Sequence, residues 1–407
     1  MILLQMNFQR ITIVAAICSL PGFSLSAPDE VIEEGLTSVS STWNPSFDDR
    51  VYEDAFMRSG ASFSRMPDKS IVRFSANTTS TSMDQGETWT SPLPVPVGEH
   101  RPSAAKVVAT LDGILVLAYM NGAENIWNWD NVTNEVSADS TLPVYAMRSA
   151  DRGRTWTSPE KIFTGRSGAL TDILADSSGN VILPITGYRR DPSRCVQFIM
   201  VTPDGGLTWT QRVIDIGGHG HHEGAMEPTM VKLLDGRIWM LIRTNHDVLY
   251  ESFSKDGGLS WSEAAPTPIS ASSSPAMVRR LSSERLVMVW NQVRPEGIDE
   301  EEWQTLPLAR RGGGFGTIPA SWHREEVSLA LSDDDGKSWS APVIIASQPG
   351  GWLSYPRLFE TSPGEIKLGL FYNMEIMPGP KAEPRGAIFL GFSEKDFLQS
   401  PASAERK

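Results

Sequence analysis

The sequence predicts an all-β protein, a six-bladed β-propeller built from four-stranded antiparallel blades. Three observations lead to this prediction. A short motif is repeated along the chain, strand-like runs flank its copies, and the 407 residues are rich in turn formers, with 34 Gly and 28 Pro. The 13 Trp add large rings that a sheet protein can bury.

The repeated motif reads Ser/Thr-x-Asp-x-Gly-x-Ser/Thr-Trp. Its Asp can accept backbone N–H bonds across a turn, its Gly permits positive φ, and its Trp can pack between neighbouring units. Intervals of 52 to 78 residues between successive aspartates fit a propeller or another repeat array. The five copies are SMDQGETW (82–89), SADRGRTW (149–156), TPDGGLTW (202–209), SKDGGLSW (254–261) and SDDDGKSW (332–339).

Strand and hairpin patterns fill the chain between the motif copies. Apolar or alternating runs at 144–148 and 327–331 lead directly into the second and fifth copies. Two strands from a hairpin and two around a motif make one blade, so five motif units and one without a motif give six blades. Residues 28–60 are expected to supply the strand that closes the ring. The hairpin patterns span 104–120, 227–243, 275–291 and 355–373.

Charge and hydropathy exclude several classes of protein. The formal net charge of −13 disfavours nucleic-acid and anionic-membrane partners. No run of eighteen apolar residues occurs, so no membrane-spanning helix is expected.

The N-terminus has the pattern of a secretory signal peptide over residues 1–26. Arg10 precedes an apolar run at 11–20, and small residues at 24–26 offer a cleavage site; the alternative is a buried first strand. Secretion or export to the periplasm would leave a single domain at 27–407. Cleavage would also leave Cys195 as the one cysteine, so no intrachain disulfide is expected, and the mature chain is expected to be a monomer.

The motif copies are identified as Asp-boxes, and the chain resembles the sialidase (neuraminidase) superfamily of six-bladed propellers from about residue 80 to about residue 375. The resemblance implies an exo-glycosidase that removes terminal sialic acid, or a related acidic sugar, from a glycan. It implies no cofactor and no catalytic metal. In that family the Asp-boxes lie on outer turns, so the five aspartates are expected to be structural.

The resemblance assigns four site residues in the family's order. Tyr355, in a Ser-Tyr-Pro sequence, corresponds to the nucleophile and Glu227 to the base that takes its proton; a phenol does not repel an anionic sugar. Arg243 and Arg324 correspond to arginines that bind the substrate carboxylate. Glu227 and Arg243 also bracket strongly apolar strands, where an unused charge would be costly. Alternatively, Tyr355 is a core ring and Arg324 is solvated.

The remaining assignments depart from the family pattern. The first arginine of sialidases lies in Phe-Arg-Ile-Pro, whereas Arg101 lies in His-Arg-Pro-Ser. The catalytic acid is expected in the long loop 121–143. Asp139 lies five residues before the strand expected to begin at Val144, and Asp130 has an aromatic neighbour that can raise a carboxyl pKa. Asp139 is ranked slightly ahead of Asp130.

A cluster of three His at 219–222 precedes Glu227. Its spacing fits no standard zinc motif, so His222 is expected to contact substrate, with a metal site or simple solvation as alternatives. The Gly-rich segment at 310–315 is expected to be a rim loop. Two other functions remain open: a propeller lyase or glycosidase acting on uronic or sulfated sugars, and a non-catalytic glycan-binding propeller.

Overall fold

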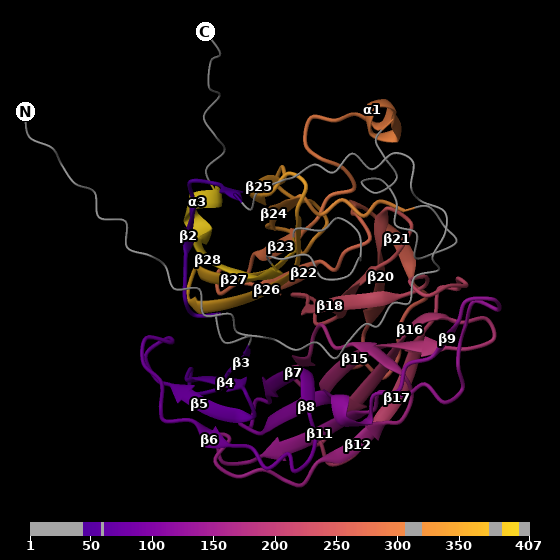
Figure 1. The fold of residues 1–407 in the computed structure, drawn as a ribbon. Coiled ribbons are helices and arrows are strands. Elements are labelled where there is room, and N and C mark those ends of the chain that lie inside the picture. The colour runs from indigo at the N-terminus through magenta and orange to yellow at the C-terminus, as the bar shows by residue number, and fades with distance from the viewer. Residues whose placement is uncertain (1–43, 58–60, 306–319, 374–384, 399–407) are drawn as a thin grey trace, which may run out of the picture.

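Six antiparallel sheets arranged around a common centre form the fold (Figure 1). The computed structural model describes residues 44–57, 61–305, 320–373 and 385–398. In every sheet the first strand lies nearest the centre and the last lies at the outside, as in the blades of a propeller. The predicted six-bladed β-propeller is therefore confirmed.

The strands follow the chain order blade by blade. Blade 1 contains β3 (Ser62–Arg65), β4 (Ile71–Ser75), β5 (Thr78–Ser82) and β6 (Leu93–Pro94). Blade 2 contains β7 (Pro102–Ala109), β8 (Leu115–Asn121), β11 (Val144–Ser149) and β12 (Glu160–Phe163). Blade 3 contains β13 (Ser167–Ala169) and β14 (Leu174–Ala175) as an interrupted first strand, then β15 (Val181–Arg189), β16 (Arg194–Thr202) and β17 (Thr210–Ile214).

The second half of the ring has the same order. Blade 4 contains β18 (Met226–Lys232), β19 (Ile238–Arg243), β20 (Val248–Ser254) and β21 (Ala265–Ser270). Blade 5 contains β22 (Met277–Arg280), β23 (Leu286–Trp290), β24 (Glu326–Ser332) and β25 (Val343–Ser347). Blade 6 contains β26 (Trp352–Ser362), β27 (Glu365–Asn373), β28 (Arg385–Ser393) and β2 (Val51–Glu53). Outside this pattern lie β1 (Ser46–Phe47), the hairpin β9 (Trp129–Asp130) and β10 (Glu135–Val136), the 3-10 turn at Gly122–Glu124, and the short helices α1 (Glu300–Thr305) and α3 (Glu394–Leu398).

The N-terminal part of the chain closes the ring. Strand β2 pairs with β28, with Val51 opposite Phe392, which confirms the predicted closing strand. Strand β1 adds to the outer edge of blade 5 by pairing with β25, which the sequence did not predict.

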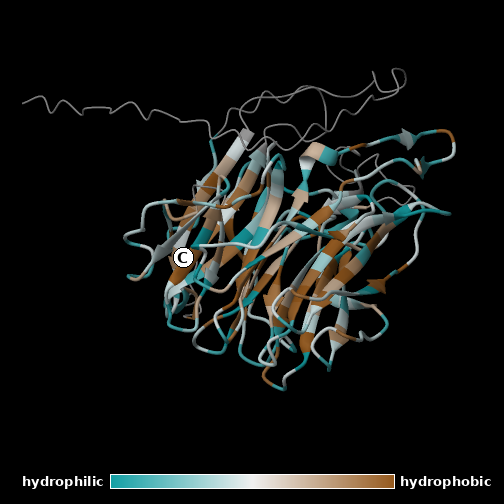
Figure 2. Ribbon diagram, turned by 90° about the horizontal axis from the view of Figure 1, so that it is seen from below, coloured by the Kyte–Doolittle hydropathy of each residue, from teal (hydrophilic) through white to brown (hydrophobic). Residues whose placement is uncertain are grey.

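Apolar side chains pack between neighbouring blades. Strands β8 and β19 are buried at every residue because sheets cover both of their faces. Five hydrophobic clusters lie at five blade-to-blade contacts, and stacked rings of Phe56, Phe63 and Phe359 join blade 6 to blade 1. Figure 2 shows this as apolar strands inside a polar periphery of turns.

Each Asp-box forms the turn between the third and fourth strands of blades 1 to 5. In the fifth box, Asp334 accepts the backbone N–H of Ser338 at 2.8 Å and its hydroxyl at 2.6 Å. Ser332 donates to Asp334 at 2.9 Å and accepts the N–H of Gly336 at 2.8 Å. The same bonds recur around Asp84, Asp151, Asp204 and Asp256, so the aspartates are structural, as predicted.

No helix among the described residues is long and apolar enough to cross a membrane.

Candidate active site

Two matching irregularities in the innermost strands place the candidate catalytic pair. A bulge interrupts β18 at Glu227 and another interrupts β26 at Tyr355, and both residues have positive φ, +34° and +56° respectively. A residue other than Gly is rarely found at positive φ, and bulges re-aim side chains. Both residues precede a proline, which cannot donate to the strand ladder at that point. Ala104 occupies a similar bulge in β7, with φ of +48°.

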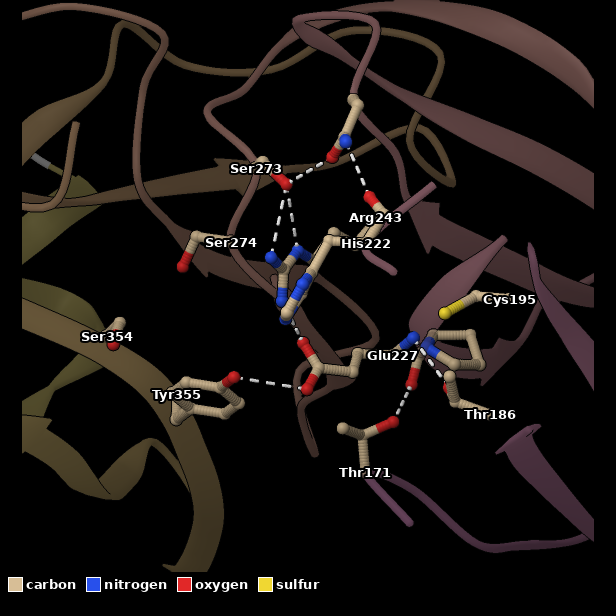
Figure 3. A network of polar contacts seen from close by, with 12 residues as sticks. Thr171, Thr186, Cys195, His222, Glu227, Arg243, Ser273, Ser274, Ser354 and Tyr355 are labelled. Atoms are coloured by element: carbon tan, nitrogen blue, oxygen red, sulfur yellow. Dashed lines mark hydrogen bonds and ion pairs between the residues drawn. The ribbon is translucent and has the colours of Figure 1, made fainter. Parts of the chain in front are cut away.

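The side chains of the two bulged residues point toward each other (Figure 3). The hydroxyl of Tyr355 donates to one oxygen of Glu227 at 3.1 Å. Nη1 of Arg243 donates to the other oxygen at 2.5 Å. Arg243 is 3% exposed whereas Tyr355 is 37% exposed, so the guanidinium is covered while part of the Tyr355 residue remains accessible.

Local structure holds Glu227 in place. Its backbone N–H donates to the hydroxyl of Thr186 at 2.7 Å, and the side chain of Gln197 donates to the same hydroxyl at 3.0 Å. Thr171 donates to the carbonyl of Pro228 at 2.7 Å (Figure 3). Blade 3 therefore fixes the position of a residue that belongs to blade 4.

Arg324 lies beside Arg243 and is connected to it through Ser273. Its Nη2 donates to the Ser273 carbonyl at 2.6 Å, while the Ser273 hydroxyl accepts from Nε and Nη2 of Arg243 at 3.2 and 3.1 Å. Arg324 stacks on Trp352 at 4.3 Å, and its buried Nε has no hydrogen-bond partner in the part of the chain that the structure describes. With 3% exposure, Arg324 is not the solvated side chain of the alternative interpretation.

The site's surroundings shift the pKa values of its residues. Loss of water around the phenol and the nearby Glu227 carboxylate raise the pKa of Tyr355, although the two arginines oppose the shift. Burial and the neighbouring charge of Arg243 lower the pKa of Arg324 to about 9, which leaves it charged at neutral pH. Burial is the largest influence on the pKa of Arg243 and acts to lower it, but the charge and hydrogen bond of Glu227, together with Tyr355 and Cys195, raise it overall.

Among the histidines at 219–222, His219 lies apart from His221 and His222, whose rings lie 4.3 Å from each other. His219 lies 3.5 Å from the carboxylate of Glu135 on the surface, and His221 joins a group of aromatic rings. His222 lies next to the site, with its ring 5.7 Å from that of Trp322. Burial, with the nearby charges of His221 and Arg243, lowers the pKa of His222 well below its usual value, so the ring is neutral at pH 7. No set of three or more His, Cys, Asp or Glu in the described part of the chain is arranged to hold a metal ion.

Arg101 lies immediately before β7, at the site end of blade 2. Its backbone N–H donates to Asn121 at 2.9 Å, whereas its side chain is exposed and takes part in no hydrogen bond or ion pair with the described residues. Arg101 is therefore not connected to the arginine pair.

The two candidate acids lie on the β9–β10 side of blade 2. Asp130 accepts the backbone N–H groups of Val132 and Thr133 at 2.8 and 3.2 Å. These bonds lower the pKa of Asp130, so the expectation that its aromatic neighbour raises that pKa is wrong. Asp139 is exposed and accepts from Asn128 at 2.9 Å. Neither carboxylate is bonded to Glu227 or Tyr355 among the described residues.

Two further expectations concern single segments. The Gly-rich stretch 310–315 lies outside the described residues. Cys195 is buried, and burial raises the pKa of its thiol to about 12, so it offers no reactive thiolate.

Sequence reasoning missed the residues that connect the charged groups. Ser273, Asn245 and Trp322 come from three separate connections at the same end of the strands. The Ser273 hydroxyl donates to Asn245 at 2.7 Å, and the Trp322 ring lies 5.4 Å from the Arg243 guanidinium and 5.3 Å from that of Arg324. Trp322 could have been noticed two residues before Arg324, but the run of serines at 272–274 carries no distinctive signal.

Comparison with known families gives a clear result. The chain matches the family described as BNR repeat-like domain over residues 76–368. The protein belongs to this family. No curated protein matches the sequence.

Several solved structures have the same fold. A protein of unknown function from Dyadobacter fermentans is 14% identical, with a TM-score of 0.55 over 85% of this chain and 100% of that one. The Hadza microbial sialidase Hz136 is 15% identical, with a TM-score of 0.53 over 84% of this chain and 66% of that one. The NanB sialidase from Streptococcus pneumoniae, as its K499G mutant, is 14% identical, with a TM-score of 0.51 over 85% and 70%. At this identity the likeness establishes the propeller fold.

Proposed function

We propose that the protein is a retaining exo-glycosidase that releases terminal sialic acid, or a related acidic sugar, from glycans. The observation that carries the proposal is the 3.1 Å hydrogen bond from Tyr355 to Glu227 beside two buried arginines. A phenol next to a carboxylate can act as a nucleophile once its proton is removed. The solved sialidases share the fold and support the proposal.

In the proposed reaction, Arg324 and Arg243 bind the substrate carboxylate. Arg324 has no carboxylate partner among the described residues, so the substrate would supply the counter-ion. The Tyr355 oxygen attacks the anomeric carbon while Glu227 takes the phenolic proton, and the leaving oxygen is protonated. Water then cleaves the tyrosyl–sugar bond, and two displacements retain the configuration.

Asp139 is the proposed acid, with Asp130 second, because Asp130 is already engaged by two backbone N–H groups. Arg101 is exposed in the free protein, and we propose that its side chain moves to contact the carboxylate when the substrate binds. We further propose that the protein is secreted or exported to the periplasm, and that it acts there as a monomer with a single domain.

The test compares an aryl sialoside, whose leaving group needs no protonation, with a sialyl-oligosaccharide. The wild-type chain should release sialic acid from both, and Tyr355→Phe should lose about 10³-fold or more in kcat/KM on both. Tyr52→Phe, on the outer strand β2, is the matched control and should retain activity. Asp139→Asn should slow the oligosaccharide more than the aryl sialoside. If neither the aryl sialoside nor the sialyl-oligosaccharide releases sialic acid, the proposed sialidase activity is contradicted.

A second function is favoured by one observation, the neutral His222 beside the arginine pair. A neutral imidazole near a carboxylate-binding pair can remove the proton next to a uronate carboxyl group, as a polysaccharide lyase requires. Unsaturated products that absorb ultraviolet light would identify this reaction. Tight glycan binding without any product would instead identify a non-catalytic propeller.

A further inference from the structure

A group of aromatic rings lies between the β9–β10 hairpin and blade 3. Its four members, named here the Trp127 cluster, are Trp127, Trp129, Tyr188 and His221. The Trp127 ring centroid lies 5.8 Å from that of Trp129, 5.2 Å from that of Tyr188 and 5.1 Å from that of His221. Both tryptophans are partly exposed, so the cluster borders solvent.

The guanidinium of Arg166 is stacked on this cluster, 4.6 Å from the Trp127 ring centroid. Its Nη1 donates to the side-chain oxygen of Asn125 at 2.5 Å and to the Thr141 carbonyl at 3.5 Å. Its Nε is buried without a hydrogen-bond partner, and no carboxylate in the described residues pairs with it. Burial lowers the pKa of Arg166, as expected for a cation that lacks a counter-ion.

Several other partly buried arginines of the protein do have such partners, whereas Arg73, stacked on Trp89, has none among the described residues. Arg194 pairs with Asp215 at 2.6 Å, and Arg279 pairs with Asp172 at 2.7 Å. Arg324, in the candidate active site, is held by neutral acceptors, as Arg166 is. A half-buried cation without a counter-ion lowers the stability of the fold. A ligand that carries the opposite charge would remove this cost when it binds.

The Trp127 cluster is continuous with the candidate active site. His221 is adjacent to His222, and their rings lie 4.3 Å apart. The His222 ring lies 5.7 Å from Trp322, which lies against both site arginines. The charge of Arg166 also contributes, after burial, to lowering the pKa of His221 to about 4. A row of rings therefore connects Arg166 to the arginine pair.

We propose that Arg166 and the Trp127 cluster bind the anionic group of a second acidic sugar, the unit next to the one held by Arg243 and Arg324. The guanidinium would bind a carboxylate or sulfate, and the indole rings would pack against the sugar ring. This inference rests on the proposed action on glycans. It makes the preferred substrate a glycan with two neighbouring acidic sugars.

The test uses three disaccharides with the same terminal acidic sugar, linked to galactose, to galactose sulfate or to galacturonate. Affinity is measured by calorimetry on the full chain carrying Tyr355→Phe, so no turnover is needed. That chain should bind at least one charged disaccharide about 10-fold or more tightly than the neutral one, since a charge-assisted hydrogen bond contributes about 1.5–3 kcal/mol. The two charged compounds distinguish carboxylate from sulfate.

Arg166→Gln should bring the ratio of charged to neutral affinity close to one, and Arg166→Lys should give an intermediate ratio. Arg190→Gln, an exposed arginine after β15, is the matched control and should keep the full ratio. Thermal unfolding verifies that each variant is folded.

Equal affinity for all three disaccharides overturns the inference, as does a ratio that Arg166→Gln leaves unchanged. If sialosides are cleaved without any such ratio, only this inference fails. If the ratio is present and depends on Arg166 but no sialoside is cleaved, only the proposed hydrolysis fails.

Discussion

The two ends of the blades differ in how completely their polar groups are hydrogen-bonded. At one end the five Asp-boxes repeat a single arrangement in which the aspartate is bonded within its own turn. At the other end Glu227 and Tyr355 occupy strained bulges, and Arg324 has a buried nitrogen that no described residue bonds. Satisfied polar groups stabilise a turn, whereas unsatisfied groups and strain are typical of sites that bind a ligand.

The comparison predicts that the same kind of substitution has different costs at the two ends. Arg243→Met leaves the Glu227 carboxylate without its cation in a covered position, so the free energy of unfolding should fall by about 3–5 kcal/mol, and turnover should be lost. The double variant Glu227→Gln, Arg243→Met should recover most of the stability but no activity. Denaturant unfolding and turnover measure both effects.

A control for this prediction lies at the box end of blade 4. Arg237 pairs with Asp235 at 2.7 Å, but Asp235 is 51% exposed. Arg237→Met should cost less than about 1 kcal/mol. Equal losses for Arg237→Met and Arg243→Met would contradict the comparison.

A second prediction concerns the glycine of the fifth Asp-box. Gly336 has φ of +80°, and an added Cβ would lie 2.5 Å from the ring of Trp239 in the neighbouring blade. Gly336→Ala should therefore lower the free energy of unfolding by about 2–4 kcal/mol through strain and overpacking, with turnover per folded molecule unchanged. Gly236→Ala has a similar φ of +90° but open space around it, so it should cost only about 1 kcal/mol. A similar cost for the two variants would show that blade packing does not matter here.

The smallest expected effect is a dependence of stability on acid. The hydroxyl and backbone N–H of Thr88 lower the pKa of Asp84 from 3.8 to about 2, and Ser338 does the same for Asp334. These boxes therefore add stability above about pH 4, and that contribution is lost as the pH falls toward 2. Asp84→Ala should lower the melting temperature slightly at pH 7 and by less near pH 2. A difference that grows on acidification would contradict this assignment.

The parts that the sequence predicted depend on local relations. The Asp-box bonds join residues four positions apart, so the motif itself predicts them. Glu227 and Arg243 belong to one hairpin with an Asp-Gly turn, which brings its two ends to the same edge. The position of Tyr355 next to them came from the resemblance, because it depends on how blade 6 meets blade 4 across the ring.

The parts that were missed depend on the exact course of the folded backbone and on contacts between distant segments. Asp130 has an aromatic neighbour in sequence, but the backbone N–H groups of its own turn determine its pKa. Ser273 connects two arginines only after blades 4 and 5 are assembled. Arg166 precedes a short strand and carries no motif; its stacking on Trp127 and its lack of a carboxylate partner among the described residues are seen only in the folded chain.

The pairing of β2 with β28 has a consequence for biosynthesis. The ribosome makes residues 51–53 long before their partner strand at 385–393. The ring therefore cannot close until that strand has emerged, and the edge of blade 6 remains open until then. A chain whose synthesis stopped before residue 385 would have no partner for β2, and its sixth blade would stay unsealed.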